Sequence, residues 1–443
     1  MKILKSMYLT NLFFVLFGGI IFLQVMAFSF PNLEAVSFVL FYTLMVLTSI
    51  DLIWILFLKE PLTFRRKFQQ KLNLGDPNEV SITLQNKTKI GLYIQLFEGY
   101  PEEMQWRKKP IQKWISAGQS YDDHYIFTPK KRGDFTFRVA VLKVRSLLQL
   151  WERNFEVSNP ESFQVYPSVL QMKKYALTVF DRQKLNQGIK KIRKIGNNQE
   201  FEQIKNYTQG DEIRKINWKA TSRKNELMVN QFQEEKSQNI YFLLEKGRTM
   251  QQESDALSML DYAINSTLAL GNITLKSGDK TGVITFSDKI GQTLPAEKRA
   301  GQLKRIMDLL YHQKTLFKEP NYDLLYQHLH RTIKTRSMLV LYSNFESLSA
   351  MRRVLPVLRL LNQKHVLIVT LFEHEELYRI AHRLPENNQD IYQSIIAESQ
   401  LKTKEQIKNE LLKNGIRTIL VKPNQLTLAT INQYLEVKAK GLL

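Results

Sequence analysis

The chain has 443 residues, with 63 lysines and arginines against 42 aspartates and glutamates, and it contains no cysteine. This length suits two or three domains, and the cysteine count excludes disulfide bonds, thiolate metal sites and a cysteine nucleophile. The net charge of +21 fits nucleic acid, an anionic membrane surface or an acidic protein as a partner.

Two long apolar segments open the chain. Residues 7–30 contain no charged side chain, and residues 36–58 contain only Asp51. Each segment is long enough to cross a hydrocarbon core of about 30 Å as a helix, and the short connector 31–35 makes the two helices antiparallel. We therefore predict a transmembrane hairpin over residues 1–60. A cleaved signal peptide is the competing interpretation of the first segment, and it would leave the second span in place.

Positive charge flanks the predicted hairpin. Lys2 and Lys5 precede the first span and a basic run follows the second over 59–71, whereas the connector carries Glu34. The positive-inside rule then predicts a two-pass protein of the bacterial inner membrane with both termini in the cytoplasm. Asp51 lies about two turns from the cytoplasmic end of its helix, so we expect it to face its partner helix, a second protomer or interfacial water.

Residues 61–167 show the alternation of apolar and polar side chains that is typical of half-buried strands. The clearest runs are 80–84, 92–97, 121–127 and 134–139. Turn-rich pieces separate these runs, which predicts an all-β, Ig-like antiparallel sandwich of about seven strands. No catalytic constellation accompanies the strands, and we interpret the sandwich as a spacer or docking module.

The segment 168–237 links the sandwich to the last domain, and its first part is basic. The basic residues are Lys173, Lys174, Arg182, Lys184, Lys190, Lys191, Arg193 and Lys194. Two interpretations explain these residues equally well. The segment is either a solvated connector or a surface for an acidic partner or for anionic lipid, which attracts each basic residue by about 1 kcal/mol. Nucleic acid is disfavoured, because no zinc-finger, RNP or helix-turn-helix pattern accompanies the charge.

The second part of this segment holds the most specific motif of the chain. Its residues are Gly196, Glu200-Phe201, Tyr207, Gly210-Asp211, Arg214, Ile216, Trp218-Lys219 and Arg223. Their order and spacing resemble the signature of the DUF58 family, whose members also have the hairpin, the sandwich and an α/β end in this order. Residues 227–238 resemble its Bacteroidetes-like branch most closely. Ser222, where alanine is usual, and Gln149, where glycine is common, depart from the family pattern.

Two interpretations of this motif remain open. Its candidate site residues are Glu202, Tyr207, Gly210, Asp211, Arg214, Trp218, Lys219 and Arg223. We favour an internal clasp that joins the sandwich to the next domain through paired charges, because a tryptophan amid paired charges is more often packed than exposed. The alternative is a docking surface on which Arg214 and Arg223 bind the carboxylates of a partner.

Strands and helices alternate from residue 238 to residue 443. The strands are 239–244, 282–287, 338–342, 366–371 and 418–421, and the clearest helices are 255–276, 298–311 and 350–363. Strands with little internal polarity that are separated by helices predict a parallel, doubly wound, Rossmann-like sheet. This part resembles the von Willebrand factor A (vWA) fold, and ligands of such sheets bind beyond the carboxyl ends of the strands.

The vWA resemblance implies a metal-ion-dependent adhesion site, or MIDAS, at this edge. The usual motif is Asp-x-Ser-x-Ser, because Mg²⁺ prefers oxygen ligands at about 2.1 Å. This chain has Glu245, Gly247 and Thr249 instead, and Asn344 stands in place of a later aspartate. The site is therefore a degenerate MIDAS that is short of anionic ligands. We expect no cofactor, with Mg²⁺ as the only candidate.

What the DUF58 resemblance implies is a non-enzymatic scaffold or adaptor. Family members are typically encoded with MoxR-type AAA+ ATPases and other vWA proteins, and are thought to act with them as a chaperone-like system at the membrane. We expect the ATPase to dock at the strand-end face near Glu245, Thr249 and Asn344. The alternative is a membrane-surface module that binds anionic lipid through residues 173–194, with the last domain serving oligomerisation. No Walker A loop or Gly-x-Ser-x-Gly elbow points to an enzyme.

Overall fold

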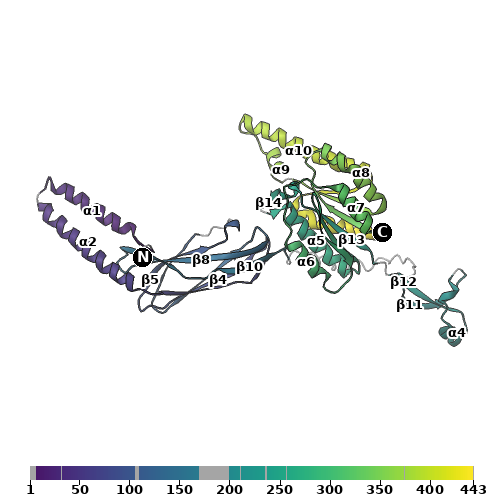
Figure 1. The fold of residues 1–443 in the computed structure, drawn as a ribbon, viewed down its shortest axis with the longest axis horizontal. Helices are drawn as coiled ribbons and strands as arrows, with labels where there is room; N and C mark the ends of the chain where they lie inside the picture. Colours follow the sequence, from purple (N-terminus) through teal and green to yellow (C-terminus); the bar gives the residue numbers. More distant parts are fainter. Residues whose placement is uncertain are drawn as a thin grey trace. The chain divides into compact units, whose positions relative to one another are not determined.

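The computed structural model describes residues 6–442, with gaps at 31, 105–108, 169–198, 210, 235–236, 256 and 374. The chain divides into two compact units, Met1–Tyr166 and Pro167–Leu443, and Figure 1 shows the elements of both. Unit 1 contains two apolar helices and a β-domain, and unit 2 contains a β-hairpin and an α/β sheet. The protein is therefore multi-domain, as its sequence predicts.

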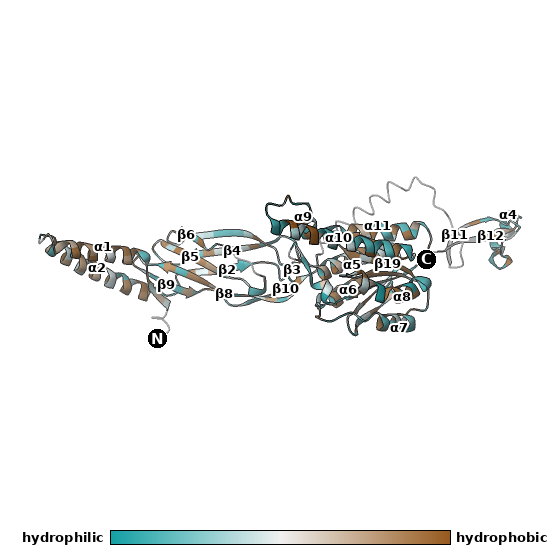
Figure 2. Cartoon of the chain, turned by 90° about the horizontal axis from the view of Figure 1, so that it is seen from above, coloured by the Kyte–Doolittle hydropathy of each residue, from teal (hydrophilic) through white to brown (hydrophobic). Residues whose placement is uncertain are grey.

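Two apolar helices of unit 1, α1 (Asn11–Ala27) and α2 (Asn32–Phe57), lie side by side. Figure 2 shows that apolar residues dominate both helices. By length and composition, α2 with its 26 residues is the helix, among those described, that could cross a membrane. α1 has 17 residues, fewer than the roughly 20 that a typical span needs.

The prediction of a helical span from residue 7 is wrong at its start. Strand β1 (Met7–Leu9) pairs antiparallel with β9 (Trp151–Glu156) of the β-domain. Thr10 then begins the helix, since its side chain accepts a hydrogen bond from the amide of Phe13. Residues 7–30 are apolar throughout, so hydropathy does not distinguish the strand at its start from the helix that follows.

Among the described residues, ten strands form the two sheets of the β-domain. Those not yet named are β2 (Leu62–Lys67), β3 (Lys71–Asn73), β4 (Asn78–Asn86), β5 (Leu92–Gly99), β6 (Ile111–Ile115), β7 (Ser120–Phe127), β8 (Gly133–Arg145) and β10 (Glu161–Tyr166). One sheet has the order β1-β9-β8-β10-β3, with β5 and β6 joined to it through β8, and the other has the order β2-β4-β7. The predicted strand number of about seven is too low, since short edge strands such as β1 and β3 have three residues each.

The two sheets of the β-domain pack face to face through aromatic rings. The ring of Phe127 in β7 lies 5.8 Å from that of Phe137 in β8 and 6.0 Å from that of Phe163 in β10. All three side chains are buried. This core follows directly from the alternation of apolar residues along the strands.

Asp51 joins α2 to the turn between β8 and β9. Its carboxylate accepts hydrogen bonds from the hydroxyl of Ser146 and from the backbone amides of Leu148 and Leu150, the last two at 3.1 Å. The expectation that Asp51 faces a partner helix, a second protomer or water is therefore wrong. It is buried against the β-domain of its own chain, and three donors replace the water that a carboxylate otherwise requires.

Side chains of β9 hold the C-terminal half of α2. The indole N–H of Trp151 donates to the carbonyl oxygen of Thr48 at 3.1 Å. Nη1 of Arg153 donates to the carbonyl oxygens of Ile55 and Leu58, both at 3.1 Å. The last carbonyls of a helix lack intrahelical partners and carry partial negative charge, so a guanidinium group stabilises them.

The larger part of unit 2 is a six-stranded sheet. Its strands are β13 (Asn239–Glu245), β16 (Lys280–Phe286), β17 (Ile290–Glu297), β18 (Met338–Tyr342), β19 (Val366–Phe372) and β20 (Arg417–Val421). The order is β17-β16-β13-β18-β19-β20, and all neighbours are parallel except the edge strand β17. In order of appearance this is 3-2-1-4-5-6, the arrangement of doubly wound sheets. The sequence did not reveal β17, which carries polar residues and Pro295 at the sheet edge.

Helices cover both faces of this sheet (Figure 1). They are α5 (Met259–Lys276), α6 (Gln302–Tyr311), α7 (Tyr322–Thr332), α8 (Leu348–Lys364), α10 (Asn388–Lys413) and α11 (Leu426–Ala439). The short helix α9 (Glu375–His382) packs on α10 and has no buried residue. Phe242 and Leu244 of β13 pack on one face with α5, α6 and α11, whereas Leu243 packs on the other face with α7, α8 and α10. Apolar side chains on both faces explain the continuous apolar strands of the sequence.

The motif that resembles the DUF58 signature lies on a separate β-hairpin. Its strands, β11 (Gln199–Asn206) and β12 (Met228–Glu234), pair antiparallel. The connection between them carries a short 3-10 helix, η4 (Ile213–Lys215), and a short helix, α4 (Trp218–Lys224).

Candidate functional site

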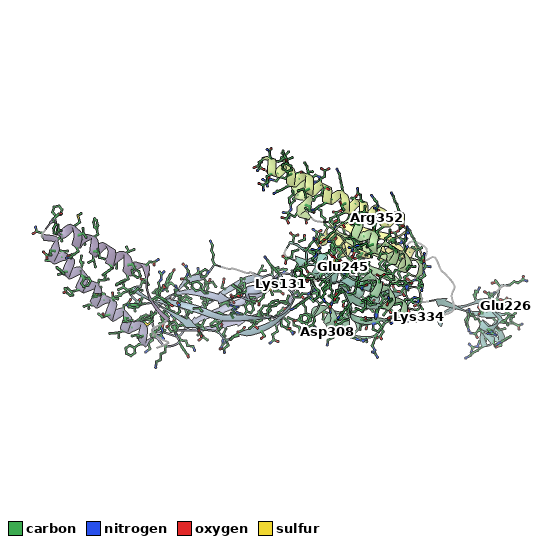
Figure 3. All side chains as sticks on the ribbon, turned by 45° about the horizontal axis from the view of Figure 1, so that its top comes forward. Lys131, Glu226, Glu245, Asp308, Lys334 and Arg352 are labelled. Atoms are coloured by element: carbon green, nitrogen blue, oxygen red, sulfur yellow. The ribbon has the colours of Figure 1, made fainter. Side chains whose placement is uncertain are left out.

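The carboxyl ends of β13 and β18 adjoin at the point where the strand order of the sheet reverses. Glu245 ends β13, and Ser343 and Asn344 follow β18. A cavity of about 450 Å³ opens here, and it is lined by Glu245, Arg248, Tyr322, Asn344, Glu346 and Arg353 among others. Figure 3 shows the position of Glu245 within the α/β domain. This edge is where doubly wound sheets bind their ligands.

Glu245 is buried, yet three hydroxyl groups satisfy its carboxylate. Ser343 Oγ donates to Oε2 at 2.5 Å, Tyr322 donates to the same oxygen at 3.0 Å, and Thr249 Oγ1 donates to Oε1 at 3.0 Å. The backbone amide of Asn344 also donates to this carboxylate. Burial raises the pKa of Glu245 above its usual range, although the donated hydrogen bonds oppose this effect.

Tyr322 reaches Glu245 because it is the first residue of α7. The side chain of Asn321 caps that helix by accepting from the amide of Leu324 at 3.0 Å. The Tyr322 hydroxyl also lies 2.7 Å from Ser343 Oγ. Burial and the adjacent carboxylate of Glu245 raise the pKa of Tyr322 well above its usual value, so this hydroxyl stays protonated and can donate.

Gly247 contributes no ligand atom, and the space beside it is closed. A Cβ atom at this position would lie 2.8 Å from Glu245 Oε1 and 3.1 Å from the backbone oxygen of Lys318. A serine, which a MIDAS requires here, would therefore collide with the carboxylate that three hydroxyls hold in place. The residues do not fit a Mg²⁺ site.

Asn344 is also engaged by protein atoms. The ammonium group of Lys404 on α10 donates to Asn344 Oδ1 at 2.5 Å and to the backbone oxygen of Phe345 at 2.7 Å. The Asn344 amide donates to Gln252 Oε1 at 3.2 Å. Burial lowers the pKa of Lys404 to about 8, although Glu346 and Glu245 act against this shift. A lysine thus brings positive charge close to where the vWA resemblance would place a metal ion.

The accessible part of the cavity is its charged rim. Arg248 pairs with Glu346 at 2.8 Å, and Lys318 pairs with Asp288 at 2.6 Å. Arg353 of α8 is exposed. Glu245 and Asn344 are buried, so a partner that docks near them would contact the rim.

Sequence reasoning found Glu245, Thr249 and Asn344 at this edge, but it missed Tyr322, Ser343 and Lys404. Ser343 could have been predicted as a site residue, since it directly follows a predicted strand. Tyr322 and Lys404 come from α7 and α10, and no sequence pattern links them to the strand ends. Within the described part of the chain, no cluster of three or more acidic, histidine or cysteine side chains could hold a metal ion.

The signature hairpin exposes several of its large apolar side chains. Trp218 is 67% exposed, and Ile213 and Leu227 are exposed as well. Asp211 pairs with Lys205 at 2.9 Å and accepts from the amide of Thr208, which lowers the pKa of Asp211 to about 2.

The other charges of the signature have no such partners. Arg214, Lys219 and Arg223 are exposed, and none of them forms an ion pair among the residues that the structure describes. Within the hairpin, therefore, Trp218 is not packed and the charges form no broad network among the described residues, since Lys205 on β11 pairs with Asp211. The clasp between the sandwich and the last domain stays a prediction. Figure 3 marks Glu226 on this hairpin, where it accepts from Asn206 at 2.9 Å.

Gly210 and the basic residues Lys173, Lys174, Lys190, Lys191, Arg193 and Lys194 lie outside the described residues. Glu202 lies on β11, and the backbone amide of Tyr207 donates to the oxygen of Leu227 at 2.8 Å. Both positions belong to the hairpin scaffold.

Residues 203–387 match the family described as "Protein of unknown function DUF58", which supports membership of this family. YeaD, an uncharacterized protein of Bacillus subtilis, is 21% identical over 232 residues, which are 50% of this chain and 55% of that protein. The chain thus spans about half the length of this relative.

Two solved structures show weaker similarity. The conserved hypothetical protein BatB from Bacteroides thetaiotaomicron is 11% identical, with a TM-score of 0.31, over 46% of this chain and 98% of that one. A CARDB domain from Pyrococcus furiosus, solved with di-metal ions, is 15% identical, with a TM-score of 0.18, over 24% of this chain and 86% of that one.

Proposed function

We propose that this protein is a membrane-anchored, non-enzymatic scaffold or adaptor. It works with a MoxR-type AAA+ ATPase, in a chaperone-like system at the cytoplasmic face of the bacterial inner membrane. The ATPase and the system come from the DUF58 resemblance, which the match over residues 203–387 supports. Partner binding, rather than chemistry on a substrate, is the role that the described surfaces favour.

The membrane topology in this proposal is two-pass, with both termini in the cytoplasm. α2 is long and apolar enough to span a bilayer. α1 is about 26 Å long at 1.5 Å per residue, and a bilayer accommodates a mismatch of a few Å at modest cost. The basic run over residues 59–71 follows α2 directly, which favours a cytoplasmic position for all that comes after it.

The α/β domain acts in this proposal as a vWA-like module that binds its partner without a metal ion. The 3-2-1-4-5-6 strand order with an antiparallel third strand is that of the vWA fold, which supports the assignment. The hydrogen bonds that Glu245 accepts from Tyr322 and Ser343 support metal-free binding, since a carboxylate engaged in this way is a poor ligand. Docking at this edge would use the rim residues Arg248 and Arg353.

The single observation that carries the proposal is the exposed signature hairpin. Trp218 projects from α4 with 67% of its surface exposed, and Arg214 and Arg223 are exposed on the same hairpin. Tryptophan and arginine are the residues most enriched at the energetic centres of protein interfaces. Their exposure together on a short hairpin favours a docking surface over an internal clasp.

The test is affinity capture of the tagged full-length protein from detergent-solubilised membranes in the presence of ATP. We expect wild-type protein to recover an AAA+ ATPase, and the double variant Trp218→Ala, Arg223→Glu to lose most of it. The matched control is Leu360→Ala, Arg331→Glu, which changes an exposed apolar residue and an exposed arginine of the α/β domain. Wild-type capture without any AAA+ ATPase, or equal recovery by both variants, would contradict the proposal.

A further inference from the structure

The N-terminal half of α10 carries an apolar surface that the α/β domain does not cover. Ile391, Tyr392, Ile395 and Ile396 are between 44% and 69% exposed. At 100° per residue these four side chains lie on one side of the helix, within about 140°. Figure 1 shows this half of α10, together with α9, extending beyond the sheet.

The two halves of α10 differ in how they pack. Ile407 and Leu411 in the C-terminal half are buried in the core of the sheet face that α7 and α8 also cover. In the N-terminal half, Ala397 is the buried residue, and Ser394 faces α9 by donating to the oxygen of Ala381 at 3.2 Å. Contact with α9 thus leaves the apolar side of the helix open. A cluster of large exposed apolar side chains marks an interaction surface.

We propose that this surface binds the same surface of a second copy of the chain, with the two α10 helices antiparallel. A two-fold axis midway along the four residues places Ile391 opposite Ile396 of the second copy. The same axis places Tyr392 opposite Ile395. Each apolar residue therefore meets an apolar residue, as a self-complementary interface requires.

The charges beside the apolar residues favour the antiparallel direction. Exposed Glu386, which pairs with Arg383, precedes Ile391 by five residues, and exposed Lys402, which pairs with Glu398, follows Ile396 by six residues. Such exposed pairs are weak and can exchange partners. Antiparallel pairing brings Glu386 of one copy close to Lys402 of the other. Parallel pairing would place Glu386 beside Glu386 of the second copy and Lys402 beside Lys402, and like charges repel.

The interface is small, and its strength follows from its composition. A standard protein interface buries about 1,600 Å² in total, and four side chains per copy supply less than that. Tyrosine and isoleucine contribute mainly through burial of apolar surface, without charges that must lose water. A modest dimer is therefore expected, and a covalent trap is the suitable probe.

Single cysteines test the geometry, because the chain has none of its own. Two differently tagged full-length copies, one with Ile391→Cys and one with Ile396→Cys, are mixed in detergent and oxidised. We expect the mixed disulfide to exceed both self-disulfides. Gln393→Cys is the control, since Gln393 is exposed about 200° around the helix from Ile391 and should cross-link poorly.

A charge on the same surface tests the energetics. Ile395→Glu should weaken the dimer at least tenfold in sedimentation equilibrium of the full-length protein, whereas Gln393→Glu should leave it unchanged. Predominant self-disulfides, a wild-type monomer at all concentrations, or an unchanged dimer in Ile395→Glu would each overturn the proposal. Protection of Ile391→Cys from a thiol reagent in a monomer would also overturn it, because another part of the chain would then cover the surface.

Discussion

The hydroxyl group of Tyr322 lies 3.0 Å from Oε2 of Glu245, at the carboxyl edge of the six-stranded sheet. Tyr322 begins α7 and Glu245 ends β13, so the contact ties a helix start to a strand end. A buried carboxylate needs donors or a cation nearby. Here the tyrosine, with Ser343 and Thr249, supplies the donors.

Tyr322→Phe should destabilise the α/β domain by about 1–3 kcal/mol, because it leaves a buried carboxylate with one donor fewer while keeping the ring. Urea denaturation of the full-length protein in detergent measures this change. Tyr326→Phe, one turn later on α7 and only partly buried, is the control and should be nearly neutral. A near-neutral effect of Tyr322→Phe, equal to that of Tyr326→Phe, would show that the buried carboxylate of Glu245 does not depend on the Tyr322 hydroxyl.

Gly247→Ser should fail to create a metal site and should cost about 1–3 kcal/mol, because its Cβ would lie 2.8 Å from Glu245 Oε1. Isothermal titration of wild type and variant with Mg²⁺ should give no binding heat at millimolar concentration. Gly118→Ser, on a turn where a Cβ meets nothing within 4 Å but where φ is +70°, measures backbone strain, which Gly247 with its φ of −70° does not have. Stoichiometric Mg²⁺ binding by the wild type would contradict our interpretation of this edge.

Lys404 makes stability depend on pH in a defined direction. Burial lowers its pKa to about 8 in the folded protein, from 10.5 in an unfolded chain. Between these values the unfolded chain binds a proton that the folded protein has lost, so this group makes the folded state more stable as pH rises. The gain across this window is at most about 3 kcal/mol.

The measurement compares wild type with Lys404→Met, by urea denaturation at pH 7.5, 9 and 10.5. The stability of wild type minus that of the variant should increase with pH, since all other groups titrate in both proteins. Lys408→Met, one turn later on α10 and paired with Glu405 at 3.4 Å, should show no such trend. A flat difference for Lys404→Met would contradict the burial of this ammonium group.

Asp51 should hold α2 against the β-domain. Asp51→Leu removes the acceptor of three hydrogen bonds and leaves the buried amide of Leu150 and the part-buried amide of Leu148 without a partner, at a cost of about 1–3 kcal/mol for the buried one. Hydrogen exchange followed by mass spectrometry should show faster exchange in residues 146–151. Ser49→Leu, at an exposed position of the same helix, should leave that exchange unchanged. Unchanged protection in Asp51→Leu would show that α2 is held by other contacts.

The periodicity of the sequence was a good guide to elements with large apolar surfaces. The strands from β13 to β20 that lie inside the sheet follow the predicted runs closely, because both of their faces are buried. The polar edge strand β17 and the three-residue strand β1 were missed, since neither has a periodic pattern of its own. Their pairing depends on a neighbour that is distant along the chain.

The sequence by itself determined the order of the domains, the apolar N-terminal helices, the missing metal ligands at Gly247 and Asn344, and the DUF58-like motif. These are properties of residue type and spacing along the chain. Only the tertiary structure decided that Tyr322 and Lys404 occupy the strand-end site, that Asp51 faces the β-domain, and that Trp218 is exposed. These contacts, and the exposure of Trp218, depend on which distant segments of the chain lie next to one another. Local sequence patterns do not specify those neighbours.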